Sequence, residues 1–270
     1  MPNKILTFVE ENKENMSKKP LILVTNDDGI TAPGIRTLIK VMNRIGDVVV
    51  VAPDSPQSGM GHAITINDTL YCREEHIDNG PQKEYSTSGT PADCVKLAVH
   101  ELLGRKPDLC VSGINHGSNS SINVIYSGTM SAAIEAGMEG IPAIGFSLLN
   151  YNWDADFDPT EQYIETICQN VLQNGLQKGI ILNVNFPNKA IKGIKICRQA
   201  NANWVEKFDK RRSPMGRDYY WLTGEFINQD HGEDTDEWAL EQGYVSVVPV
   251  QFDLTAHYYI QELNNWKLNG

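Results

Sequence analysis

The hydrophobic positions of the chain fall into short continuous runs, rich in Val, Ile and Leu, that alternate with segments of helical period. Runs that do not alternate with polar residues are typical of strands buried on both faces. Because helical segments separate several of these runs, the pattern predicts a mostly parallel sheet with helices on both faces, a Rossmann-like α/β fold. The runs are residues 21–25, 48–52, 109–113, 143–147 and 180–184.

The signals at the ends of the helical segments support this interpretation. Thr90 stands at an N-cap position, Pro91 follows in the first turn, and Asp93 completes a capping-box-like pattern. Gly104 and Gly175 stand where two of the segments are expected to end. The segments of helical period are residues 33–46, 91–104, 127–140 and 158–175.

The pattern changes after about residue 190. Residues 218–226 and 244–250 have strand character, and they flank a polar, acidic stretch. We expect residues 200–250 to form an antiparallel extension and the last twenty residues a partly helical tail. The predicted organisation is a polar N-terminal extension (1–19), an α/β catalytic core (20–190), and a C-terminal β-extension with its tail packed on the core (191–270).

Composition narrows the classes of function. The 270 residues carry 34 acidic and 23 basic side chains, a formal charge of -11, which argues against a nucleic-acid polymer as partner. The five cysteines include no C-x-x-C pair, which favours a reduced, cytoplasmic chain over a disulfide scaffold or zinc module. We find no apolar run of membrane-spanning length. The basic stretch 207–217 is interpreted as a solvated or subunit-contacting face.

Oxygen-bearing side chains follow three of the predicted strands. Asp27 and Asp28 come after the first, residues 53–59 after the second, and residues 113–117 after the third. Ligands of parallel sheets bind at the carboxyl ends of strands. Two carboxylates with hydroxyl and amide oxygens suit Mg²⁺ or Mn²⁺ better than zinc. Taken alone, an Asp-Asp-Gly turn or a helix cap also explains the first of these loops.

A second candidate segment leads into the helix expected at 127–140. Ser127, Gly128 and Thr129 precede a run of small residues, and the free amides of such a helix start attract phosphate. The alternative is an ordinary Ser/Thr cap with a glycine for close packing. The segment is not a Walker loop, since the lysine of that motif is missing.

Other candidate residues carry weaker signals. His116 is interpreted as an exposed loop histidine, with substrate contact or proton transfer as the alternative. His62 receives no role, and the acidic run 230–236 is interpreted as a surface loop because it lacks ligand spacing. Neither G-x-S-x-G nor G-x-G-x-x-G follows a strand, which excludes a serine hydrolase of that type and a dinucleotide-binding site.

Four ordered blocks of the chain resemble the SurE (survival protein E) family of metal-dependent 5′-nucleotidases and phosphatases. The resemblance is strong from residue 21 to about 150 and looser beyond. The blocks read ILVTNDDGI, VVAPDSPQSGMGHAITI, STSGTPADCVKLAV and VSGINHGSN followed by SGTMSAAIEA.

The resemblance implies roles for individual residues. The metal-binding aspartates of the family fall on Asp27 and Asp28, its metal-binding serine on Ser58 and its metal-binding asparagine on Asn115. One divalent ion per subunit is implied, Mg²⁺ or Mn²⁺ with Ca²⁺ as a further candidate. The phosphate-contacting segment falls on residues 127–129. A homodimer or homotetramer, with C-terminal arms exchanged between subunits, is also implied.

The predicted activity is that of a phosphomonoester hydrolase, a 5′-nucleotidase that releases nucleoside and phosphate. Nucleoside 5′-monophosphates are the expected substrates, with 3′-monophosphates and short polyphosphate as further candidates. Asp27 and Asp28 are the candidate catalytic residues, and an aspartate acting as base or as nucleophile both remain open. The alternatives are a non-catalytic nucleotide or metal sensor and a haloacid-dehalogenase-like phosphatase, whose D-x-D-G-T spacing differs from the adjacent pair here.

Overall fold

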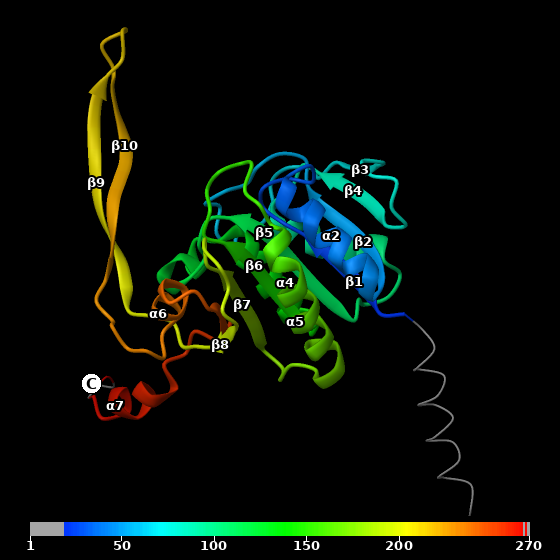
Figure 1. Cartoon of the computed structure of the whole chain (residues 1–270). Coiled ribbons are helices and arrows are strands. Elements are labelled where there is room, and N and C mark those ends of the chain that lie inside the picture. Colours follow the sequence, from blue (N-terminus) through cyan, green and yellow to red (C-terminus); the bar gives the residue numbers. More distant parts are fainter. Residues whose placement is uncertain (1–18, 267, 269–270) are drawn as a thin grey trace, which may run out of the picture.

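The computed structural model describes residues 19–266 and 268, so all but the last residue of the predicted polar extension 1–19 lies outside the described residues (Figure 1). A nine-stranded sheet in the order β3-β4-β2-β1-β5-β6-β7-β11-β8 forms its centre. The strands are β1 (Leu21–Thr25), β2 (Asp47–Pro53), β3 (Cys72–Glu75), β4 (Lys83–Thr87), β5 (Leu109–His116), β6 (Ala143–Leu148), β7 (Ile180–Phe186), β8 (Ile194–Ile196) and β11 (Val245–Gln251).

Strand β1 lies in the middle of the sheet, parallel to β2 on one side and β5 on the other. Parallel pairing continues outward to β4 on one side and to β6 and β7 on the other. Only β3 with β4 and β11 with β7 pair antiparallel within this sheet. The mostly parallel α/β fold is therefore confirmed, and each of the five predicted apolar runs lies in a strand.

Helices cover both faces of the sheet (Figure 1). Helices α2 (Pro33–Ile45) and α5 (Glu161–Asn174) pack on one face, where they bury Leu38 and Ile164. Helices α3 (Pro91–Leu97) and α4 (Gly128–Met138) pack on the other face. Gly145 of β6 makes room for the Met130 side chain of α4, since a Cβ on this glycine would meet the Met130 sulfur at 2.4 Å.

The predicted helix signals are present in the structure. Thr90 accepts the N–H of Asp93 at 3.2 Å while Asp93 accepts the N–H of Thr90 at 2.9 Å, which completes the capping box. The helix expected over 91–104 is shorter, because α3 passes into a π-helical turn at Ala98–Leu102. The segment expected over 158–175 begins with a 3₁₀ turn at Asp158–Thr160 and ends at Gly175, whose φ of 71° suits glycine.

The C-terminal part divides between an extension and the sheet. Strands β9 (Ala202–Arg212) and β10 (Asp218–Asn228) form a two-stranded hairpin that reaches away from the core (Figure 1). By contrast β11 pairs with β7, so this part of the expected extension lies in the central sheet. The tail is partly helical, as predicted. It contains a 3₁₀ turn at His257–Tyr259 and helix α7 (Ile260–Asn264). Helix α6 (Asp236–Glu241) lies earlier in the chain, before β11.

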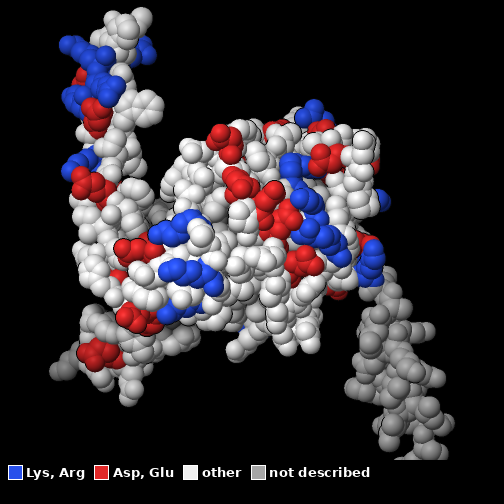
Figure 2. All heavy atoms as spheres, in the orientation of Figure 1, with Lys and Arg blue, Asp and Glu red and all other residues white. Residues whose placement is uncertain are grey.

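Charges of both signs are interspersed over the face of the core in view, and basic side chains gather near the tip of the hairpin (Figure 2). Several of these are paired within the hairpin, among them Lys210 with Asp218 at 2.8 Å. The basic stretch is thus exposed at the hairpin, as expected of a solvated face. None of the helices in the described part of the chain is both long and apolar enough to cross a bilayer.

Candidate active site at the carboxyl ends of the strands

The loops after β1 and β2 are fastened to each other by backbone hydrogen bonds. The N–H of Gln57 donates to the carbonyl of Asp27 at 2.7 Å, and the N–H of Ile30 donates to the carbonyl of Pro53 at 2.9 Å. Gly29 has a φ of 96°, which allows the turn between them. Asp27 and the residue before Ser58 therefore lie at one edge of the sheet.

Asp27 is nearly enclosed, with 4% of its surface exposed. Its Oδ1 accepts the hydroxyl proton of Thr129 at 2.5 Å. Gly128 lies directly against it, because a Cβ on this glycine would come within 2.7 Å of the Asp27 Cβ. The start of α4 therefore packs on the first carboxylate, and glycine at position 128 makes this approach possible.

Asp28 is held by the third loop. Its Oδ2 accepts the backbone N–H of His116 at 3.1 Å. The end of β5 is irregular here, since its register against β6 shifts between Ser112 and Asn115. The side-chain amide of Asn115 donates to the carbonyl of Gly117 at 2.9 Å, which fixes the amide and leaves its oxygen as an acceptor.

Both carboxylates have raised pKa values. Burial and repulsion from Asp28 raise the pKa of Asp27 to about 7, although hydrogen bonds from Thr129 oppose this change. Burial also raises the pKa of Asp28, although the hydrogen bond from the backbone N–H of His116 opposes this change. None of the ion pairs among residues 19–266 and 268 involves either aspartate. A divalent cation fits this arrangement, because it would offset both charges.

The donor set also fits a hard cation. Within the described ranges no three His, Cys, Asp or Glu side chains gather as a metal site would require. An ion held here would therefore need neutral oxygens in addition to the two carboxylates. Ser58 is exposed in the second loop, and Asn115 is partly buried at the end of β5. The N–H of Gln57 donates to the backbone carbonyl of Asp27, and the N–H of His116 donates to the Asp28 carboxylate. The segments that carry Ser58 and Asn115 therefore contact the residues of the pair.

The start of α4 offers donors next to these carboxylates. Ser127 is its N-cap and accepts the N–H of Met130 at 3.0 Å, so the hydroxyl proton of Ser127 is left to donate. The structure directs the hydroxyl of Thr129 to Asp27, which gives this residue a contact that the sequence did not indicate. The first amides of the helix also point out of its N-terminus.

His116 differs from the expected exposed loop histidine. It ends β5 and is partly buried, with Trp153 stacked on its ring at 5.5 Å and Phe157 edge-on at 5.0 Å. Its Nδ1 donates to the carbonyl of Asn152 at 2.9 Å. The aromatic residues of 151–157 account for the difference, since they fold back over the loop.

His62, to which the sequence gave no role, belongs to a polar cluster beside α4. Its Nε2 lies 2.8 Å from Oε2 of Glu135, and Nζ of Lys96 lies 2.6 Å from Oε1 of the same carboxylate. Glu135 is buried, and the hydrogen bonds from His62 and Lys96 outweigh burial and lower its pKa. A glutamate on the expected buried face of a helix is the signal in the sequence that a partner must exist.

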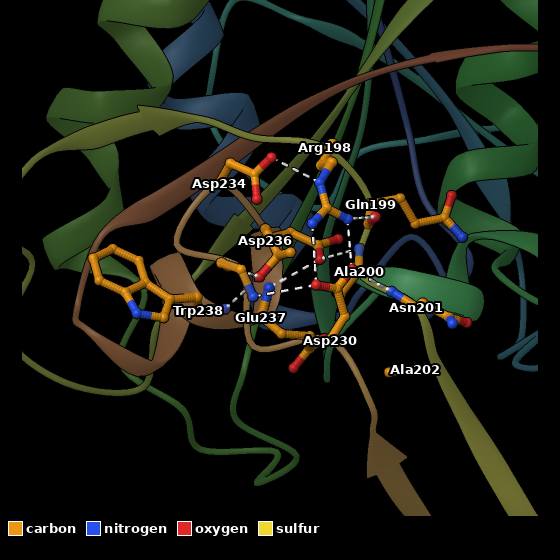
Figure 3. Close-up of polar contacts among 12 residues, drawn as sticks. Arg198, Gln199, Ala200, Asn201, Ala202, Asp230, Asp234, Asp236, Glu237 and Trp238 are labelled. Carbon is orange, nitrogen blue, oxygen red and sulfur yellow. Dashed lines mark hydrogen bonds and ion pairs between the residues drawn. The ribbon is translucent and has the colours of Figure 1, made fainter.

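The acidic run 230–236 is not wholly a surface loop, because Asp236 is fully buried (Figure 3). Its two carboxylate oxygens accept the N–H groups of Ser121 at 2.8 Å and Ala200 at 2.9 Å. Asp230 and Asp234 instead hold Arg198 on the outside. Asp236 thus ties the start of the C-terminal extension to the segment that precedes α4, and its place at the first turn of α6 is the local signal.

Together these loops define a class of protein: a doubly covered parallel sheet whose strand ends carry paired carboxylates beside a helix N-terminus. The family model described as "Survival protein SurE" matches residues 22–206. The chain belongs to this family.

Close relatives agree over almost the whole length. The "5'-nucleotidase SurE" of Christiangramia forsetii is 72% identical, covering 93% of this chain and 98% of the relative. The "5'-nucleotidase SurE" of Flavobacterium psychrophilum is 71% identical, covering 93% of this chain and 99% of the relative. The crystal structure of the SurE protein from Aquifex aeolicus has a TM-score of 0.79 and 39% identity, covering 91% of this chain and 98% of that one.

Proposed function

We propose that the chain is a 5′-nucleotidase that hydrolyses nucleoside 5′-monophosphates to nucleoside and phosphate. The observation that carries this proposal is the contact of the start of α4 with Asp27, since it joins a pair of adjacent carboxylates to a set of anion-binding donors. The name shared by relatives up to 72% identical supports the same activity. Nucleoside 3′-monophosphates and short polyphosphate are further candidate substrates.

Asp27, Asp28, Ser58 and Asn115 are the residues we propose to hold one divalent ion per subunit. Mg²⁺ and Mn²⁺ suit this all-oxygen set best, and Ca²⁺ is compatible with it. When bound, such an ion would polarise a phosphoryl oxygen and favour the ionised forms of both aspartates.

The residues of the chain itself bind and orient the phosphate. Ser127 offers its hydroxyl proton, and the amides of Gly128 and Thr129 at the start of α4 add partial positive charge. Thr129 holds Asp27 in position through its side chain. These donors stabilise the negative charge that is spread over the phosphoryl oxygens in the transition state.

Asp28 is the aspartate we propose to act in the reaction, because it is less enclosed than Asp27 and only one of its oxygens is engaged by His116. It acts either as the base that takes the proton of the attacking water or as the nucleophile itself. The stereochemical course at a phosphorus made chiral with oxygen isotopes separates these roles. Net inversion identifies a single displacement by water with Asp28 as the base, and net retention identifies two successive displacements through a phosphoaspartate.

The activity is tested with purified protein, a panel of nucleoside monophosphates, and added Mg²⁺, Mn²⁺ or EDTA. We expect phosphate release with either metal and its loss with EDTA. Nucleotide binding without phosphate release under every metal condition would instead identify a sensor. A haloacid-dehalogenase-like phosphatase is disfavoured, because its D-x-D-G-T spacing differs from the adjacent Asp27 and Asp28.

We propose that the protein forms a homodimer or homotetramer through its C-terminal extension. The hairpin exposes large apolar side chains, among them Phe208, Trp221 and Leu222, which a partner surface would cover. Light scattering of the intact chain and of a variant without residues 203–227 tests this. We also propose a cytoplasmic location, which the five free thiols support.

A further inference from the structure

The loop of residues 117–126 connects two parts of the candidate site. It follows the end of β5, where Asn115 is a proposed ligand of the ion, and it leads to Ser127, the N-cap of α4. Its middle forms a 3₁₀ turn, Ser121–Ile125, just before the phosphate-binding start of the helix. A displacement of this turn would therefore move the hydroxyl and amide donors that we assign to phosphate.

Backbone preference alone does not set the shape of this loop. Ser121 has a φ of 52°, in the left-handed region that residues other than glycine adopt uncommonly. Its side chain is nevertheless fully buried. Conformations of this kind persist where surrounding contacts hold them. The shape of the loop therefore depends on its contacts with other parts of the chain.

The C-terminal extension supplies several of these contacts. The hydroxyl of Ser121 donates to the carbonyl of Ala200 at 2.8 Å, and its N–H donates to the carboxylate of Asp236 at 2.8 Å. The hydroxyl of Ser120 donates to Oε1 of Glu237 at 2.5 Å. Ala200 precedes the hairpin of β9 and β10, whereas Asp236 and Glu237 follow it. The loop is thus held by the chain on both sides of the base of the hairpin.

A further contact comes from the hairpin itself, close to the place where it leaves the core (Figure 1). Trp204 lies near the start of β9, and its indole N–H donates to Oδ1 of Asn123 at 2.8 Å. Phe226 stands opposite Trp204 on β10, with the two ring centroids 5.5 Å apart, and supports the indole. A change in the direction of the hairpin would therefore act on the 3₁₀ turn through Trp204.

We propose that Trp204 is a positioning residue for phosphate binding and that, through Asn123, it couples the direction of the hairpin to the phosphate site. The inference rests on the proposed function and adds a residue that acts through another. Coupling between two sites is reciprocal. Phosphate bound at the start of α4 therefore stabilises the contact of Trp204 with Asn123, and a partner that bends the hairpin away from the turn weakens phosphate binding.

Trp204→Phe removes the indole donor and keeps an aromatic ring. We expect the dissociation constant of inorganic phosphate, measured by calorimetry with Mg²⁺, to rise about three- to tenfold, the size expected of one lost hydrogen bond. Trp221→Phe makes the same change at an exposed position on the other strand of the hairpin and is expected to keep the affinity of the unmodified protein.

Asn123→Ala removes the acceptor of the same hydrogen bond and is expected to weaken phosphate binding to the same extent. Because each variant breaks the contact from one side, a folding defect in one leaves the other informative. The double variant of Trp204→Phe and Asn123→Ala should bind phosphate no more weakly than either single variant, since both changes remove one shared interaction.

Tryptophan emission provides a readout that a purely structural role would leave unaffected. We expect phosphate to change the emission of the unmodified protein and of Trp221→Phe. The change should be smaller in Trp204→Phe and also in Asn123→Ala, which keeps every tryptophan.

Unchanged phosphate affinity in both single variants would overturn the proposal. So would losses that add in the double variant, because the two residues would then act independently. Failure of the unmodified protein both to bind phosphate and to release it from AMP would instead overturn the proposed function.

Discussion

The hydroxyl of Thr129 donates to Oδ1 of Asp27 at 2.5 Å, across 102 positions of sequence. The contact joins the end of the central strand β1 to the start of α4. Burial and the charge of Asp28 favour the protonated form of the Asp27 carboxyl group, and the hydrogen bond from Thr129 opposes them.

We expect Thr129→Val to lower kcat/KM by about 10- to 100-fold. Valine has nearly the same shape as threonine but lacks the hydroxyl that donates to Asp27. Thr129→Ser keeps the hydroxyl and is expected to retain most of the activity. Steady-state kinetics on both variants, with circular dichroism as the check on folding, decide the matter. Equal activities in the two variants would show that the hydrogen bond is unimportant.

Asp28→Asn is expected to abolish turnover while the fold is retained. The amide keeps the shape of the side chain and removes the charge that the proposed ion and proton transfer both require. Asp54→Asn is the matched control, since Asp54 is an exposed carboxylate in the neighbouring loop. Near-normal activity in Asp28→Asn would mean that the metal site is assigned wrongly.

Gly128→Ala tests the close approach of α4 to the first carboxylate. The added methyl group would lie 2.7 Å from the Asp27 Cβ, so one of the two must move. We expect a loss of activity together with a destabilisation of about 1 to 3 kcal/mol, measured by urea unfolding. A variant as stable and as active as the unmodified chain would contradict the packing described here.

Glu135 predicts a pH dependence of stability. Its pKa is lowered in the folded state, so its contribution is present above its ordinary value of 4.5 and is lost as pH falls through the folded-state pKa. The difference in unfolding free energy between the unmodified protein and Glu135→Gln should therefore be largest above pH 4.5 and shrink as the pH falls below 4.5. Denaturant unfolding across this range measures it, and a constant difference would contradict the ion-paired cluster.

Asp236→Ala is expected to destabilise the protein by about 2 to 4 kcal/mol, because the buried N–H groups of Ser121 and Ala200 lose their acceptor. Asp234→Ala is the matched control from the same acidic run. Its carboxylate pairs with Arg198 in solvent, so we expect a much smaller change. Urea unfolding curves compare the two, and equal effects would argue against a special role for Asp236.

Much of the fold could be predicted because the strands of the core are continuous apolar runs. The run at 21–25 coincides with β1, and the runs at 143–147 and 180–184 fall within β6 and β7. The short strands β3 and β8 carry few buried side chains, so no hydrophobic pattern marks them. The run at 244–250 was recognised as a strand, yet only tertiary pairing shows that β7 is its neighbour.

The candidate site was predictable in its positions and not in its contacts. The loops after β1, β2 and β5 meet because parallel strands end at one edge. The packing of Gly128 on Asp27 and the burial of His116 under Trp153 depend on how distant segments fold over one another. Asp236 was hidden within a stretch whose composition is that of a solvated loop. Of its neighbours that pair with Arg198, Asp234 is exposed and Asp230 is partly buried.

The hairpin of β9 and β10 leaves the core and returns at one place. Ala202 and Asn228 stand opposite each other at its base, and the strands before and after it, β8 and β11, are neighbours in the sheet. Removing or adding residues in cross-strand pairs would preserve the register and leave the base untouched. The hairpin is thus a module whose length can change without moving the strand ends that carry Asp27 and Asp28.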